Sequence, residues 1–266
     1  DERAVLSDVA VGLNLAHQRA VHADVSTAFK APYQRTMQAN VTLDSIRPIN
    51  EPPFLMSPAN STLLVDAFSI EAAAPILVLN TNDAGNGSLR WAIATAAAST
   101  TSFNAITFAP ALSGESIRLS SELVVNDPSG VAIDASMLSR GLTIDGGTGN
   151  NRIFNVSGSS TRLLLRRLNL TSGNITSGTS GGAIAIAASA VSLDACSLSG
   201  NSSSADGGAI FNSTGILRCY GCTFSGNQAS FGGAIYSDTD FAYQSTTLVR
   251  CTFSNNSATI GGGLRN

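Results

Sequence analysis

The C-terminal part of the chain repeats one phrase several times. Close copies begin at Cys196 (CSLSGNSSSADGGAI), Cys222 (CTFSGNQASFGGAI) and Cys251 (CTFSNNSATIGGGL), and a degenerate copy, LNLTSGNITSGTSGGAI, begins at Leu168. The starts of these copies are almost evenly spaced along the chain. A repeat of this kind, with a period in the range of about 20–50 residues and short apolar runs between Gly, Ser and Asn, is typical of a solenoid, in which each repeat buries its apolar side against its neighbours.

The repeat favours strands over helices. Apolar and polar side chains alternate in runs such as Val191-Ser192-Leu193 and Cys222-Thr223-Phe224, and this alternation places every second side chain on one face, as a half-buried strand requires. The intervening stretches are too polar and Gly-rich for a helix. Leucine-rich repeats have a similar length, but their leucine spacing is absent. The sequence therefore predicts an all-β, right-handed parallel β-helix with two or three short strands in each coil.

Two features of the copies have structural explanations. Paired glycines precede each strand start, where glycine tolerates positive φ and leaves room for the next coil. One asparagine per copy can adopt the left-handed conformation, and stacked copies predict an internal amide ladder. The residues assigned to this framework are Gly181, Gly182, Gly207, Gly208, Gly232, Gly233, Gly261, Gly262, Asn174, Asn201, Asn227 and Asn256.

We expect residues 76–266 to form the β-helix and residues 1–75 to form a non-repetitive arm and linker. Residues 4–28 carry apolar side chains at roughly helical spacing, which favours a helix or strand packed on the solenoid, or an arm that docks on a neighbouring subunit. Residues 88–98 should form a short helix over the first coil, because an uncovered coil exposes unpaired backbone groups. The chain stops in mid-repeat, so we expect its last coil to be continued or covered by more protein.

The four cysteines fall in the last three coils. Alignment of the copies puts Cys196, Cys222 and Cys251 at one register and Cys219 at the register of Leu193. Neighbouring strands lie about 4.8 Å apart, a Cα separation that a disulfide accepts. Two alternatives are open: a disulfide between coils in an oxidising compartment, or a buried column of reduced thiols. With no second cysteine pair and no nearby histidine, the sequence predicts no metal site and no cofactor.

Asparagine sequons are dense. Either they carry N-linked glycans on a secreted protein, or they reflect the Asn and Ser content of β-helix corners. Within the repeats, we expect glycans at Asn201, Asn212 and Asn255. The sequons begin at Asn40, Asn60, Asn86, Asn155, Asn169, Asn174, Asn201, Asn212 and Asn255.

Charge and hydropathy exclude some partners. Charged residues make up 12% of the chain, the formal net charge is -3, and Lys30 is the single lysine. A nucleic-acid partner would need a basic stripe, so none is predicted. No apolar run approaches the length of about 18 residues that can cross a bilayer. The N-terminus has no signal-peptide pattern, so we expect a secreted chain whose signal peptide has been removed.

The repeats resemble the polymorphic outer-membrane-protein repeat family, which is recognised by paired GGA[ILV] and FxxN motifs. GGAI occurs three times, with GGGL as a variant, and FxxN is met at Phe224–Asn227 and Phe253–Asn256, with Leu198–Asn201 as a near match. Two upstream phrases, NTNDAGNGSLRWAI and LTIDGGTGNNRIFNV, also look like early coils of such proteins. The resemblance covers residues 76–266 and implies a secreted or cell-surface β-helix used in adhesion or as a structural stalk.

Two functional classes compete. The first is a non-catalytic extracellular structural or adhesive protein, part of an appendage, fibre or larger assembly, whose partners are further copies of itself, other extracellular proteins or glycans. The second is a polysaccharide lyase or glycoside hydrolase, because β-helices also carry such enzymes and fold alone does not decide function. The best acid and base candidates are Asp134 and Asp145, with Arg140 between them. Asp145-Gly146 is also an ordinary turn, so no catalytic residue is assigned.

Overall fold

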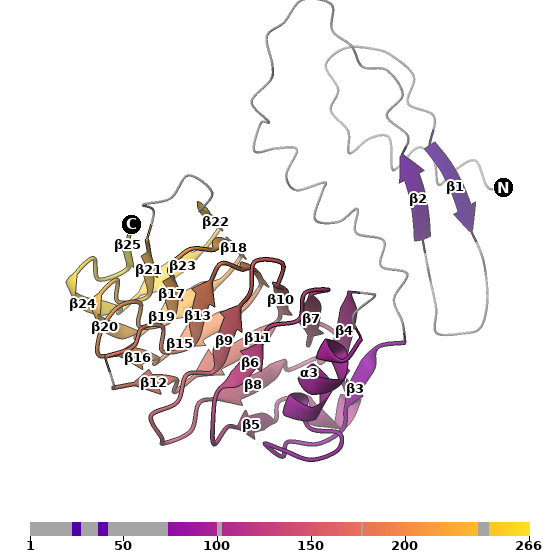
Figure 1. Cartoon of the computed structure of the whole chain (residues 1–266), viewed down its shortest axis with the longest axis horizontal. Coiled ribbons are helices and arrows are strands. Elements are labelled where there is room, and N and C mark those ends of the chain that lie inside the picture. Colours follow the sequence, from indigo (N-terminus) through magenta and orange to yellow (C-terminus); the bar gives the residue numbers. More distant parts are fainter. Residues whose placement is uncertain (1–22, 28–36, 42–73, 100–102, 177, 239–244) are drawn as a thin grey trace, which may run out of the picture. The chain divides into compact units, whose positions relative to one another are not determined.

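A computed structural model of the chain describes residues 23–27, 37–41, 74–99, 103–176, 178–238 and 245–266 (Figure 1). The chain divides into two units, Asp1–Ser69 and Ile70–Asn266. In the first unit, β1 (Ala23–Thr27) pairs antiparallel with β2 (Met37–Val41), and Val25 lies opposite Ala39. Most of the segment 4–28, for which a helix or strand was predicted, lies outside the described residues.

The second unit is a parallel β-helix, which confirms the predicted fold class. After β3, its strands wind through six coils, and strands at the same place in successive coils pair in parallel. Coil 1 contains β4 to β6, coil 2 contains β7 to β9, and the following coils contain four strands each: β10 to β13, β14 to β17, β18 to β21 and β22 to β25. The later coils thus have one strand more than predicted, because a short strand also forms beside the asparagine of each repeat.

Four sheets form the walls of the β-helix (Figure 1). Sheet I contains β3 (Ile76–Val78), β4 (Asn104–Phe108), β7 (Val131–Asp134), β10 (Arg162–Arg166), β14 (Ala190–Asp194), β18 (Ile216–Tyr220) and β22 (Ser245–Val249). Sheet II contains β5 (Ser116–Arg118), β8 (Leu142–Asp145), β11 (Leu168–Thr171), β15 (Ser197–Ser199), β19 (Thr223–Ser225) and β23 (Thr252–Ser254).

Sheets III and IV complete each coil and lead back to sheet I. Sheet III contains β12 (Asn174–Ile175), β16 (Ser202–Ser203), β20 (Gln228–Phe231) and β24 (Ser257–Ile260). Sheet IV contains β6 (Leu123–Val125), β9 (Phe154–Ser157), β13 (Ile184–Ala187), β17 (Ile210–Asn212), β21 (Ile235–Ser237) and β25 (Leu264–Arg265).

The core is a set of stacked apolar columns inside the coils. In sheet IV, Ile184 lies opposite Ile210, and Ile210 lies opposite Ile235. All three side chains are 0% exposed. The isoleucines of the GGAI motifs therefore form an inward column, and the β-helix buries its repeats against one another as a solenoid requires.

A single α-helix among the described residues, α3 (Leu89–Ala97), covers the start of the β-helix. Ser88 caps it, since its hydroxyl accepts a hydrogen bond from the Trp91 amide over 3.2 Å. One face of α3, formed by Leu89, Ala92, Ile93 and Ala96, is buried in the core. The predicted helix over the first coil is therefore confirmed. A 3₁₀ turn, η1 (Pro110–Leu112), links β4 to β5.

Candidate functional site

The glycine pairs form the corner where sheet III turns into sheet IV. Gly207 has φ of +61°, a conformation that L side chains adopt at a cost. A Cβ placed on Gly208 would overlap the carbonyl oxygen of Gly233 in the next coil. Positive φ recurs at Gly181, Gly232 and Gly261, the first glycines of the other pairs. These glycines therefore allow the coils to stack closely.

The repeat asparagines form an internal amide ladder. Nδ2 of Asn201 donates to Oδ1 of Asn227 over 3.0 Å, and Nδ2 of Asn227 donates to Oδ1 of Asn256 over 2.9 Å. Each amide also donates to a carbonyl oxygen of an adjacent coil, namely Leu170, Leu198 and Phe224. The predicted ladder is present at these three positions, where it serves the fold.

Two details of the ladder prediction are wrong. Asn174 is not a rung: it lies opposite Ser202, and the amide of Gly173 instead donates to Oδ1 of Asn201 over 2.9 Å. The copy that begins at Leu168 has an additional residue before its asparagine, which shifts the register. The ladder asparagines also lack positive φ. The residue before each rung adopts it instead, at Gly200, Gly226 and Asn255.

All four thiols are free. Cys219 lies opposite Leu193 as predicted, and opposite Leu248 on its other side. Cys196, Cys219 and Cys222 are at most 2% exposed. Interaction with the Cys222 thiol, together with burial, raises the pKa of Cys196 and Cys219. The Cys196 thiol also donates to the carbonyl oxygen of Leu165 over 3.4 Å. Hydrogen bonds from the Cys196 and Cys219 thiols in turn lower the pKa of Cys222. The burial and the free thiols favour the interpretation as a buried column of reduced thiols.

Two of the expected glycan sites are buried. Asn201 and Asn212 are 0% exposed. Nδ2 of Asn212 donates to the carbonyl oxygen of Gly215, and the Gly215 amide donates to Oδ1 of Asn212. A glycan at either position is incompatible with these contacts, so the expectation is wrong for both. The sequon pattern is local, whereas burial depends on neighbouring coils.

The other sequons differ in exposure. Asn86 and Asn255 are exposed, whereas Asn155, Asn169 and Asn174 are half-buried. Nδ2 of Asn155 also donates to Oε1 of Glu122 over 3.0 Å. The side chain of Asn40 and the whole of Asn60 lie outside the described residues. Asn86 and Asn255 are therefore the sequon asparagines whose side chains the described structure leaves accessible.

Asp134 and Asp145 bond to separate partners. Asp134 accepts a hydrogen bond from the Ser136 amide and lies 3.8 Å from Arg166. Asp145 accepts from the Gly147 amide and lies 3.6 Å from Arg118. The backbone amide of Arg140 donates to Ser113, and neither aspartate has an ion pair with Arg140. Each carboxylate thus stabilises its own turn.

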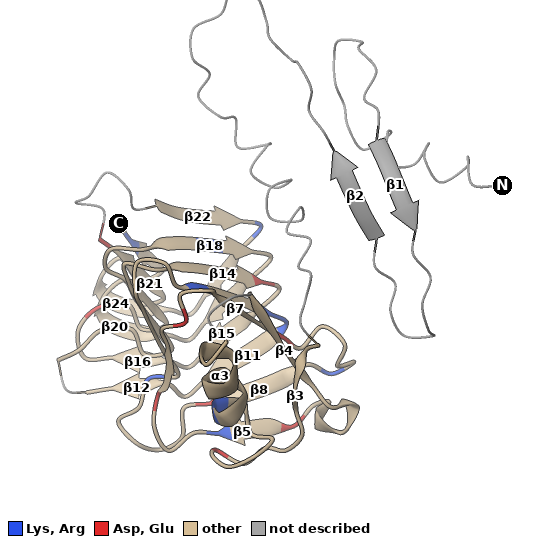
Figure 2. Cartoon of the chain, turned by 45° about the vertical axis from the view of Figure 1, so that its right-hand side comes forward, with Lys and Arg blue, Asp and Glu red and all other residues tan. Residues whose placement is uncertain are grey.

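The charged residues of the β-helix are few and scattered along the ribbon (Figure 2). In the part of the chain that the structure describes, no cluster of three or more His, Cys, Asp or Glu residues could hold a metal ion. No helix within the same residues is long and apolar enough to cross a membrane.

An ion-pair network ties α3 to the first coil. Arg90 of α3 bonds to the Asp83 carboxylate over 2.6 Å and donates to the carbonyl oxygens of Ser121 and Glu122, each over 2.7 Å. Burial alone would raise the pKa of Asp83, but hydrogen bonds from Ser120 and Arg90 outweigh burial and lower this pKa below its ordinary value. The Glu122 carboxylate in turn pairs with the buried Arg152 over 2.9 Å. The sequence analysis did not predict this network. Asp83 and Arg90 are close in the sequence, but their other partners come from later segments of the chain.

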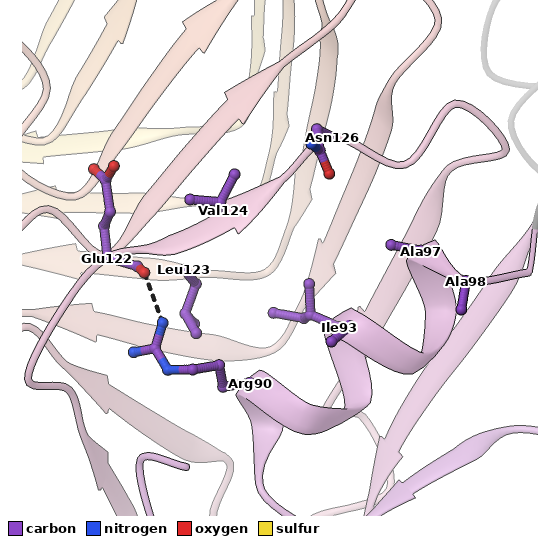
Figure 3. Close-up of a pocket in the computed structure, with 9 residues that line it drawn as sticks. Arg90, Ile93, Ala97, Ala98, Glu122, Leu123, Val124 and Asn126 are labelled. Carbon is purple, nitrogen blue, oxygen red and sulfur yellow. Dashed lines mark hydrogen bonds between the residues drawn. The ribbon is translucent and has the colours of Figure 1, made fainter. Parts of the chain in front are cut away.

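A shallow pocket lies beside this network, between α3 and β6 (Figure 3). Its volume is about 570 Å³. One side is formed by α3 and the other by the segment from Glu122 to Asn126. Its lining is mostly apolar, and the two charged groups at its end, Arg90 and Glu122, already have partners within the chain. No motif in the sequence indicated this pocket.

Comparisons with known proteins agree with the coil geometry. The family model of the Chlamydia polymorphic membrane protein repeat matches residues 195–213 and 221–238. The matched segments include the Asn201 and Asn227 rungs and the glycine pairs at 207–208 and 232–233. No curated protein matches the chain. The resemblance inferred from the motifs is confirmed for these two repeats, and the chain is a β-helix that carries two repeats similar to those of the polymorphic membrane proteins.

Proposed function

We propose that the chain is a non-catalytic extracellular element, structural or adhesive, that forms part of a surface appendage, fibre or larger assembly. The observation that carries this proposal is the repeat itself. Its matched residues are used to stack coils: the glycines at the corners, the asparagines in the ladder and the isoleucines in the core. A repeat whose recurrent residues all serve packing builds length and presents its outer faces to partners.

The acidic groups support the non-catalytic part of the proposal. Asp134 and Asp145 cap turns and lie beside different arginines, rather than facing one another across a pocket. Hydrolases need two carboxylates on opposite sides of the scissile bond. For partners we propose further copies of the chain, other extracellular proteins or glycans, reached after removal of a signal peptide.

Surface labelling of the producing cells tests this proposal. Antibodies against residues 178–238 should label intact cells as strongly as permeabilised cells, and a protease added outside should remove the label. A cytoplasmic protein of the same cells provides the control, because it should be labelled only after permeabilisation. Labelling that required permeabilisation would contradict the extracellular assignment.

A further inference from the structure

Among the residues that the structure describes, strand β6 is paired along one edge and has no partner on the other. It is the terminal strand of sheet IV and pairs there with β9, with Leu123 opposite Phe154. The Leu123 amide donates to the carbonyl oxygen of Ile153 over 2.8 Å. In a parallel ladder, alternate residues of a strand bond to the same neighbour, so Leu123 and Val125 bond to β9 and the peptide groups of Val124 point the other way. The Val124 peptide groups therefore face the side on which α3 lies.

The pocket of Figure 3 lies along this edge. Val124 is 49% exposed, and the facing side of α3 presents the small side chains of Ala94 and Ala97, followed by Ala98 at the helix C-cap. At one end, Arg90 already donates to the carbonyl oxygens of Ser121 and Glu122. Those carbonyls belong to the segment that leads into β6. The side chain of Arg90 thus supplies hydrogen bonds to the carbonyl oxygens just before β6. Among the described residues, no side chain donates in this way to the carbonyl oxygen of Val124, the next position on the edge.

We propose that this groove binds an extended, uncharged peptide segment of a partner protein by strand addition to β6. Main-chain hydrogen bonds to the peptide groups of Val124 would supply the affinity, and the space over Ile93 and Leu123 would take one apolar side chain. An extended peptide carries alternating donors and acceptors, which a strand edge requires. Because Arg90 and Glu122 are already paired, a charged occupant would gain no new ion pair from them.

The geometry of the groove favours one strand of a partner over a second copy of the β-helix. The helix α3 lies along one side of the pocket, so a folded β-helix stacked on the edge of β6 would collide with it. A single extended strand needs only the spacing of neighbouring strands, about 4.8 Å. The proposal depends on the first coil alone and holds whether or not the protein lies on a cell surface.

A substitution at Val124 tests the proposal without disturbing the pairing of β6 with β9. Val124→Pro removes the amide that points into the groove, and proline is tolerated at an edge strand where the amide is not used in the ladder. Val124→Thr is the matched control, because it keeps the amide and the β-branched shape. The probe is the pentapeptide IFNVS, the sequence of residues 153–157, with a neutral fluorophore on its N-terminus and an amide at its C-terminus. It is therefore uncharged, and the same segment of the chain pairs with the other edge of β6.

We expect the full chain and Val124→Thr to raise the anisotropy of the probe with the same Kd, and Val124→Pro to bind at least about tenfold more weakly at unchanged melting temperature. Two further probes carry N-methyl groups at every second residue, one on the odd and one on the even positions. Since only alternate amides of an added strand bond to β6, one of these probes should lose binding and the other should keep it. Equal binding by Val124→Pro, or no binding by the parent at millimolar probe, would overturn the proposal. So would a dimer of the parent that Val124→Pro dissolves, since the edge would then bind a second copy.

Discussion

Replacement of Asn227 by alanine tests whether the amide ladder stabilises the stack of coils. Asn227 is 0% exposed. Its Oδ1 accepts from the amide and from Nδ2 of Asn201, each over 3.0 Å, and its Nδ2 donates to Asn256 and to the carbonyl oxygen of Leu198. Alanine removes all four hydrogen bonds. The backbone N–H of Asn201 then stays buried without the Oδ1 acceptor of Asn227.

The expected loss can be worked from these contacts. Leaving a buried polar group unsatisfied costs about 1–3 kcal/mol. The Asn201 amide and the Leu198 carbonyl both lose a partner, and the absent side chain leaves a small cavity. We therefore expect Asn227→Ala to lower the free energy of unfolding by about 3–5 kcal/mol.

Urea unfolding followed by far-ultraviolet circular dichroism measures this loss. Ser225→Ala is the matched control, since Ser225 lies close to Asn227 in the same coil but faces outward from β19; it should change stability by less than about 0.5 kcal/mol. If Asn227→Ala unfolded at the same urea concentration as Ser225→Ala, the ladder would not stabilise the coils and the reasoning would be refuted.

Three further predictions concern thiols, glycans and catalysis. In the folded chain, a thiol-alkylating reagent should modify half-exposed Cys251 before buried Cys196, whose modification should require denaturant; equal rates would argue against the buried column. When the chain is secreted from a eukaryotic cell, peptide mass spectrometry should find N-glycans at Asn255 and none at Asn201, and a glycan at Asn201 would contradict its burial in the ladder. Purified protein should not cleave acidic or neutral polysaccharides, and turnover that disappeared in Asp145→Asn would establish an enzyme instead.

The sequence predicted the coils well because the repeat determines its own register. Equivalent GGAI motifs place Ile184, Ile210 and Ile235 at the same point of successive coils, and the structure stacks them there. The short helix was also predictable, since Ser88 precedes a run of helix-forming residues and its hydroxyl caps the first turn.

The predicted register was wrong in the copy that begins at Leu168, which differs in length from the other copies. The additional residue near Gly173 moved the predicted rung to Asn174, although the glycine backbone occupies that level of the ladder. The burial of Asn212 was missed for a different reason, since the sequon is a local pattern whereas contacts with later segments, such as the one with Ser237, bury this side chain.

The pocket beside β6 could not be predicted because its parts are distant in the sequence. Its edge exists only once β6 pairs with β9 of the following coil, and its other side comes from α3, which precedes the first coil. No local pattern in the sequence reports which edge of a short strand remains unpaired.

Electron microscopy of native material, with gold-labelled antibodies against residues 178–238, tests the central claim most directly. If the chain is a structural or adhesive element of a surface assembly, the label should decorate fibres, stalks or a regular layer outside the cell. Label confined to the cell interior, on isolated particles of the mass of a single chain, would contradict the claim.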